Sequence, residues 1–202
     1  SIILYFPPTW IYFNADISSD QRLSLMMAQA VNPFEVDYSN NFNNVLAYRI
    51  IVPLFNHLLG LRGFWIILPS LLGSYLLLIV SSKILERYFN KLNSRILLIS
   101  LSSSYLFVSG TNYWGANDSL AVAIILLVVL FKPFWIQSFL IFLAISIDER
   151  SLFSILLLPL LIKCYQDQSI ITLKEVLFYY LRWLPGFICV FLLRLLITNG
   201  II

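Results

Sequence analysis

The sequence predicts an all-α protein, a polytopic bundle of transmembrane helices with several short or broken helices and a long first extracytoplasmic loop. Two observations support this prediction. Hydrophobic residues make up 60% of the 202 residues and charged residues only 11%, with a mean hydropathy of +0.87. The segment from Ile96 to Ile162 contains only five charged residues, Asp118, Lys132, Asp148, Glu149 and Arg150. A soluble domain cannot bury that much apolar surface, whereas a bilayer accommodates it.

The N-terminal part predicts a partial helix and then a polar loop. The apolar segment Ser1 to Ala15 is too short and too rich in proline for a full span. We therefore expect residues 1–202 to form a single transmembrane domain that is a fragment or a truncated protein. The loop from Asp16 to Val45 is net acidic and contains one short amphipathic helix that stops before Asn32. The apolar face of that helix comprises Leu23, Met26, Met27 and Ala30.

The next two apolar segments differ in kind. Tyr48 to Leu61 is short and interrupted by Arg49, Pro53 and His57, which predicts an interfacial or re-entrant segment. Phe64 to Ser82 is the first clear span. The basic stretch Lys83 to Arg95 follows it, and the positive-inside rule places that stretch in the cytoplasm and the acidic loop outside.

From there the predicted segments alternate between the two sides of the membrane. They are the outward span Ile96–Tyr113, the outer turn Gly110–Asp118, the inward span Ser119–Phe131, the inner turn Lys132-Pro133, the outward span Phe134–Ile147, the outer turn Asp148–Arg150, the inward span Ser151–Ile162, the inner loop Lys163–Glu175 and the outward helix Val176–Thr198. Ser151 to Ile162 covers only about 18 Å of a hydrocarbon core of about 30 Å. We therefore expect a sunken site, in which Arg150 is buried and hydrogen-bonded to a carboxylate.

This topology collects the charged residues of the outer turns on one side. They are the acids Asp16, Asp20, Glu35, Asp37, Asp118, Asp148 and Glu149, with Arg49, His57, Arg150 and Arg194. Carboxylates beside guanidinium groups suit a reaction in which a base activates a hydroxyl while arginine holds a phosphate. Three alternatives stay open: the loop acids are simply solvated, His57 makes a structural polar contact, and Asn117 or Asp118 caps a helix within what also reads as a glycosylation sequon.

In their order, four of these elements resemble the GT-C superfamily of integral membrane glycosyltransferases. They are Asp16 after the first helix, Ala47-Tyr48-Arg49-Ile50-Ile51-Val52-Pro53, Asn117-Asp118-Ser119, and Glu149-Arg150-Ser151 ahead of Leu158-Pro159. The resemblance implies sugar transfer from a polyprenyl-phosphate donor to a glycan, lipid or protein acceptor at the extracytoplasmic face. Asp16 and Asp20 would be catalytic, and the donor phosphate would lie beside Arg49, Arg150 and Arg194. Five further residues would line the cavity: Tyr48, His57, Asp118, Asp148 and Glu149.

The sequence also bounds the partners and the rival functions. We expect an enzyme in the cell membrane, the inner membrane in a bacterium, surrounded by lipid and without a nucleic-acid partner, because no basic run is interleaved with aromatic residues. The resemblance leaves open whether a divalent cation takes part. It implies Asp16 first and Asp20 second as the catalytic base or the metal contact. The alternatives are a multi-pass transporter or flippase of lipid-linked saccharide and a non-catalytic membrane scaffold.

Overall fold

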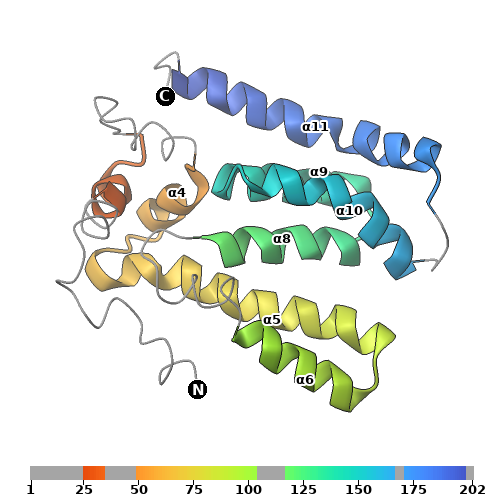
Figure 1. Ribbon diagram of the computed structural model, residues 1–202. Helices are drawn as coiled ribbons and strands as arrows, with labels where there is room; N and C mark the ends of the chain where they lie inside the picture. The colour runs from red at the N-terminus through yellow and green to blue at the C-terminus, as the bar shows by residue number, and fades with distance from the viewer. Residues whose placement is uncertain (1–24, 35–48, 104–116, 167–170, 199–202) are drawn as a thin grey trace.

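The computed structural model describes residues 25–34, 49–103, 117–166 and 171–198. Within these ranges every regular element is a helix, and no strand occurs (Figure 1). The all-α prediction is therefore confirmed for the described part of the chain. The predicted residues Asp16, Asp20, Glu35, Asp37 and Tyr48 lie outside it.

Short helices form one end of the molecule. One covers residues 25–31, where a short helix was predicted, and α4 (Ile51–Leu58) and the 3-10 helix η2 (Gly63–Ile67) follow. Met26 and Ala30 pack against Ile66 and Ile67. His57 Nδ1 lies 3.3 Å from the carbonyl oxygen of Ala30, to which Arg62 also donates. His57 thus makes a structural contact at the C-terminal end of the helix over residues 25–31. This agrees with the alternative in which His57 has a structural role.

The first long helix continues past its predicted end. α5 spans Leu68–Tyr88 and α6 spans Lys91–Ser102, so the basic stretch is mostly helical rather than a loop. The turn is only Phe89-Asn90, and the Asn90 side chain caps α6 by accepting a hydrogen bond from the backbone N–H of Asn93 at 2.9 Å. The predicted boundary at Ser82 was wrong because lysine, arginine and glutamate are good helix formers, so a charge does not end a helix.

The remaining helices follow the predicted segments closely. α8 spans Asp118–Leu130 and α9 spans Phe134–Ile147, both as predicted to within one residue. α10 (Ser151–Gln166) continues beyond the predicted end at Ile162, and α11 (Leu173–Thr198) begins before Val176. At about 1.5 Å per residue, α8, α9 and α10 are roughly 20 to 24 Å long, whereas α11 reaches about 39 Å.

The helices run back and forth and place the polar turns at two opposite ends (Figure 1). α8 contacts α5, α9 and α10, while α11 packs mainly on α9 and α6 on α5. The starts of α5, α8 and α10 and the ends of α9 and α11 lie at the end where α4 sits. The described helices alternate in direction as predicted. The second half of the predicted span Ile96–Tyr113 and nearly all of the predicted turn Gly110–Asp118 lie outside the described residues.

Apolar side chains fill the interior of the bundle and also cover much of its outside. The core cluster includes Ile124, Val128, Ile141, Ile155 and Trp183. Two helices in the described part of the chain, Trp65–Tyr88 and Leu173–Ile197, are long and apolar enough to cross a membrane. These two helices support membrane association.

Buried polar side chains join neighbouring helices at specific points. Ser70 Oγ donates to Asn117 Oδ1 at 2.6 Å, and the hydroxyls of Ser74 and Ser119 are 3.0 Å apart, which ties α5 to the start of α8. Asn117 occupies the N-cap position of α8, but its side chain makes no capping hydrogen bond. The Asn117 side chain therefore does not cap α8, because its amide oxygen accepts from Ser70 of α5 instead, although α8 starts where the prediction placed a helix start, with Asp118 in its first turn.

Candidate functional site

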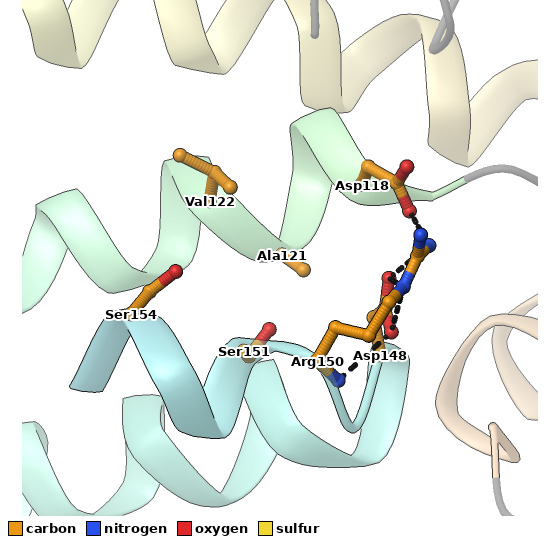
Figure 2. Close-up of a pocket in the computed structure, with 7 residues that line it drawn as sticks. All are labelled: Asp118, Ala121, Val122, Asp148, Arg150, Ser151 and Ser154. Carbon is orange, nitrogen blue, oxygen red and sulfur yellow. Dashed lines mark hydrogen bonds and ion pairs between the residues drawn. The ribbon is translucent and has the colours of Figure 1, made fainter. Parts of the chain in front are cut away.

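Five charged side chains from three separate parts of the chain meet at one end of the bundle. Arg49 precedes α4, Asp118 opens α8, and Asp148, Glu149 and Arg150 form the turn between α9 and α10. We call these five residues the charged cluster. Figure 2 shows three of them, with Arg150 lying between Asp118 and Asp148.

Asp148 is the centre of the charged cluster. Its side chain is only 5% exposed and lies 2.7 Å from Arg150 Nη2 and 3.3 Å from Arg49 Nη2. Arg150 Nε donates to both carboxylate oxygens at 3.1 Å, and the backbone N–H of Arg150 donates to Oδ1 at 3.0 Å. A buried carboxylate with two guanidinium partners and a backbone donor is fully compensated, so the turn is held in one conformation.

A second pair links residues that are 100 positions apart in the chain. Arg49 Nε donates to Glu149 Oε2 at 3.2 Å, and Arg49 Nη2 donates to Oε1 at 2.8 Å. This two-pronged geometry is the strong form of an arginine–carboxylate pair. It fastens the segment before α4 to the turn between α9 and α10.

Arg150 also pairs with the third carboxylate of the charged cluster, that of Asp118. Its Nη2 lies 2.5 Å from Asp118 Oδ1, and the side-chain exposures are 59% for Arg150 and 17% for Asp118. The predicted pairing of Arg150 with a carboxylate is confirmed, but its predicted burial is wrong. The long side chain runs outward from the turn and keeps one side of the guanidinium in contact with solvent.

The two aspartates differ in their protonation. Burial raises the pKa of Asp118 to about 6, and a hydrogen bond with Asp148 acts in the same direction, against the lowering effect of Arg150. Burial would also raise the pKa of Asp148, but hydrogen bonds from Arg150 and Asp118 and the charge of Arg49 outweigh it and lower the pKa. Asp118 is therefore the carboxylate of this pair that takes up a proton near neutral pH.

A pocket of about 180 Å³ opens beside the charged cluster, between α8 and α10 (Figure 2). Its walls are formed by Asp118, Ala121, Val122, Asp148, Arg150, Ser151 and Ser154. The pocket offers a proton acceptor, a guanidinium and two hydroxyl groups around an apolar floor. This combination can bind an anionic or hydroxyl-bearing group and move a proton at Asp118.

Ser151 and Ser154 line the pocket although neither was predicted as a site residue; Ser151 appeared only within the Glu149-Arg150-Ser151 element. Both lie on the first turn of α10, three positions apart, so their side chains share a face. That spacing directly after Asp148-Glu149-Arg150 was the available signal for them.

Four predicted residues of the described ranges do not line this pocket: Arg49 and Glu149, which belong to the charged cluster, and His57 and Arg194. His57 bonds to Ala30, and Arg194 lies near the end of α11. Within the described ranges, no three histidine, cysteine, aspartate or glutamate side chains are arranged to hold a metal ion. The carboxylates of the charged cluster are paired with arginines instead.

Comparison with protein-family models, curated proteins and solved structures gives no match. The resemblance to GT-C glycosyltransferases therefore depends on the sequence elements described above.

Proposed function

We propose that this chain is a multi-pass membrane protein with GT-C-like glycosyltransferase activity, which moves a sugar from a polyprenyl-phosphate donor to an acceptor at the extracytoplasmic face. The observation that carries the proposal is the convergence of the charged cluster at one end of an apolar bundle, beside a pocket. Charged side chains at membrane depth are costly even when paired, so their presence there points to a functional site.

The exposed apolar surface supports the membrane part of this proposal. Phe153, Leu156 and Leu157 of α10 are each at least 60% exposed, and Leu181 and Phe191 of α11 are similarly exposed. Contiguous apolar faces of this kind are rare on soluble monomers. In a bilayer, these side chains would face lipid.

The apolar core favours a one-sided site over a transport path. Below the charged cluster the interior is filled by Ala121, Ile124, Val128, Ile145 and Ile155. A coupled transport path needs ionisable groups along its length. Among the described buried side chains Asp148 is the only ionisable one, and the polar ones farther along the bundle, such as Ser81, Gln137 and Ser138, are uncharged. The core therefore supports an enzyme that works at one face rather than a transporter.

The chemistry assigns roles to three side chains. Arg150 and Arg49 would stay near the donor phosphate, which leaves with the electrons of the broken bond between sugar carbon and phosphate oxygen. The acceptor oxygen forms the new bond to the sugar and loses its proton to a carboxylate. The resemblance implies Asp16 first and Asp20 second as this base. Asp118 is not assigned the role, because an anion at Arg150 favours its protonated form.

A transfer assay tests the proposal. The full chain in lipid nanodiscs receives a radiolabelled polyprenyl-phosphate sugar, and transfer to an acceptor is measured. Asp16→Asn should lower turnover by about 10²-fold, and Arg150→Ala should weaken use of the donor. Lys132→Ala, at the opposite end of α8, is the control that retains turnover. Full turnover in both Asp16→Asn and Asp20→Asn would contradict the enzymatic assignment.

A further inference from the structure

We infer that an anion and the Asp118 carboxylate compete for the Arg150 guanidinium, so that binding an anion in the pocket is coupled to the uptake of one proton by Asp118. The inference rests on the proposed function only in taking a phosphate-type anion as the natural ligand.

The two carboxylates hold Arg150 unequally. Asp148 binds both Nε and Nη2 with its two oxygens, whereas Asp118 makes one end-on contact with Nη2. Asp148 is also the more buried of the two, with a side-chain exposure of 5% against 17%. Displacing Asp148 would strand a buried charge, so Asp118 is the partner that an incoming anion replaces.

The anion can reach Arg150 directly from water. The Arg150 side chain is 59% exposed and forms part of the pocket wall. Ser151 and Ser154, on the same side of the pocket, add hydroxyl donors. An anion held there would keep a guanidinium contact while Asp118 loses its own.

The charges around Asp118 explain why a proton must enter. Asp118 faces Asp148 and Arg150 from the turn between α9 and α10, and Arg49 from the segment before α4. Glu149 is paired with Arg49, while α5 presents at this end the uncharged hydroxyls of Ser70 and Ser74.

With Asp118 ionised, three carboxylates stand against two guanidinium groups, a net charge of −1 that repels an anion. Removing the Arg150 contact and adding a negative ligand both favour the protonated form of Asp118. Burial has already raised the pKa of this carboxyl to about 6, so little further change is needed for it to bind a proton at neutral pH.

Calorimetry with sulfate tests the coupling, because sulfate itself does not titrate near neutral pH. The full chain in detergent micelles is titrated at about pH 7 in two buffers of different ionisation enthalpy, which yields the number of protons bound per sulfate. We expect a value approaching one, and an affinity that falls roughly five- to tenfold for each pH unit above about 6. No proton uptake, or no sulfate binding between about pH 5 and pH 8, would overturn the inference.

Two carboxylate-to-amide variants separate Asp118 from the rest of the charged cluster. Asp118→Asn should bind sulfate about tenfold more tightly at pH 7 and take up no proton. Glu149→Gln removes the same charge but leaves the contacts of Arg150 in place, so it should keep the uptake. Size-exclusion elution and tryptophan emission confirm that each variant is folded. Equal proton uptake in native protein and Asp118→Asn would contradict the assignment to Asp118.

The source of the anion is decided by a second ligand. Polyprenyl phosphate is titrated in the same micelles. If it binds more tightly than sulfate and takes up a proton on binding, the natural ligand is a lipid phosphate. If the two affinities are similar, the natural ligand is a soluble phosphate-type anion. Proton-linked binding without sugar transfer would keep this inference and overturn the proposed function. Sugar transfer without proton-linked binding would do the reverse.

Discussion

At the scale of single residues, Asp148 organises the candidate site. It is nearly inaccessible, and it accepts hydrogen bonds from the backbone and the guanidinium of Arg150 while Arg49 lies in ion-pair contact. A buried ion pair adds little net stability compared with apolar residues, but removing one partner leaves the other charge uncompensated. The contribution of Asp148 to the free energy of unfolding is therefore measured by deleting its carboxylate.

Asp148→Ala should lower the free energy of unfolding by about 1 to 3 kcal/mol, because the turn loses the carboxylate that accepts from the backbone and guanidinium of Arg150, while each arginine keeps a second carboxylate. Denaturant titration in mixed micelles measures the loss. Glu149→Ala is the matched comparison, and its loss should be smaller because the Glu149 side chain is 31% exposed. Equal losses would mean that Asp148 is not the centre of the charged cluster.

The raised pKa of Asp118 predicts how the free energy of unfolding depends on pH. Its pKa is about 6 in the folded protein against 3.8 for the ordinary carboxyl, so between these values the folded state holds a proton that the unfolded state lacks. The stabilising contribution is complete below pH 3.8 and is lost as the pH rises through about 6. Asp148, whose pKa is lowered, acts in the opposite direction at more acidic pH.

The loss assigned to Asp118 amounts to at most about 3 kcal/mol. Unfolding titrations at a series of pH values should show the decline in native protein and not in Asp118→Asn. A decline of the same size in the variant would assign the pH dependence to another group.

At the scale of elements, two glycines permit close approach between helices. A Cβ atom on Gly73 of α5 would lie 2.4 Å from the Cβ of Leu120 in α8. A Cβ atom on Gly186 of α11 would lie 2.4 Å from the backbone oxygen of Ser138 in α9. Backbone atoms cannot move aside as a flexible side chain can, so the contact of α11 with α9 requires glycine.

Gly186→Ala should therefore destabilise the bundle by about 1 to 3 kcal/mol, the usual penalty of overpacking. The midpoint of thermal unfolding in micelles measures it. Gly60→Asn is the control, because Gly60 has a φ of 65° that asparagine tolerates and open space around its Cβ position. A Gly186→Ala protein as stable as the control would disprove the close contact.

The buried side-chain amide of Gln137, near the N-terminal end of α9, joins α8, α9 and α11. Gln137 Nε2 donates to the carbonyl oxygens of Val128 and Phe131, and Gln137 Oε1 accepts from Trp183 Nε1 at 3.2 Å. Gln137→Leu would strand the indole N–H and should cost about 1 to 3 kcal/mol. In the double variant with Trp183→Phe, the second substitution should add little, a coupling that a double-mutant cycle measures. Additive losses would show that the two side chains act independently.

At the scale of the whole molecule, the two ends of the bundle differ in charge. The charged cluster lies at the end beside α4. The C-terminal end of α5, which carries Lys83 and Arg87, and the C-terminal end of α8, which Lys132 follows, lie at the other end (Figure 1). This asymmetry predicts that the basic end is cytoplasmic.

Cysteine labelling in intact cells tests this orientation. Native Cys164 and Cys189 are first replaced by serine, because both are exposed. A cysteine at Leu59, beyond α4, should react with an impermeant reagent from outside, and one at Asn90, in the turn before α6, should react only after the membrane is opened. Both positions are exposed, so accessibility depends on the side of the membrane. Labelling of both from outside would contradict the topology.

The sequence by itself determined where most helices lie and which turns share an end. α8 and α9 begin and end within one residue of prediction because hydropathy changes sharply at Asp118, Lys132 and Asp148. Hydropathy is a local property, and alternation of direction then brings Asp118 and the Asp148–Arg150 turn to the same end. The same signal failed at the end of α5, where charged residues continue a helix that apolar ones began.

Only the tertiary structure decided how the charges pair and what they can do. The bond between Arg49 and Glu149, the central place of Asp148 and the open face of Arg150 depend on three segments that are far apart in the chain. The raised pKa of Asp118 has the same origin, because burial and neighbouring carboxylates are properties of the packed structure. A charge in the sequence has a sign, but its solvation and its partners exist only after folding, and these set its chemistry.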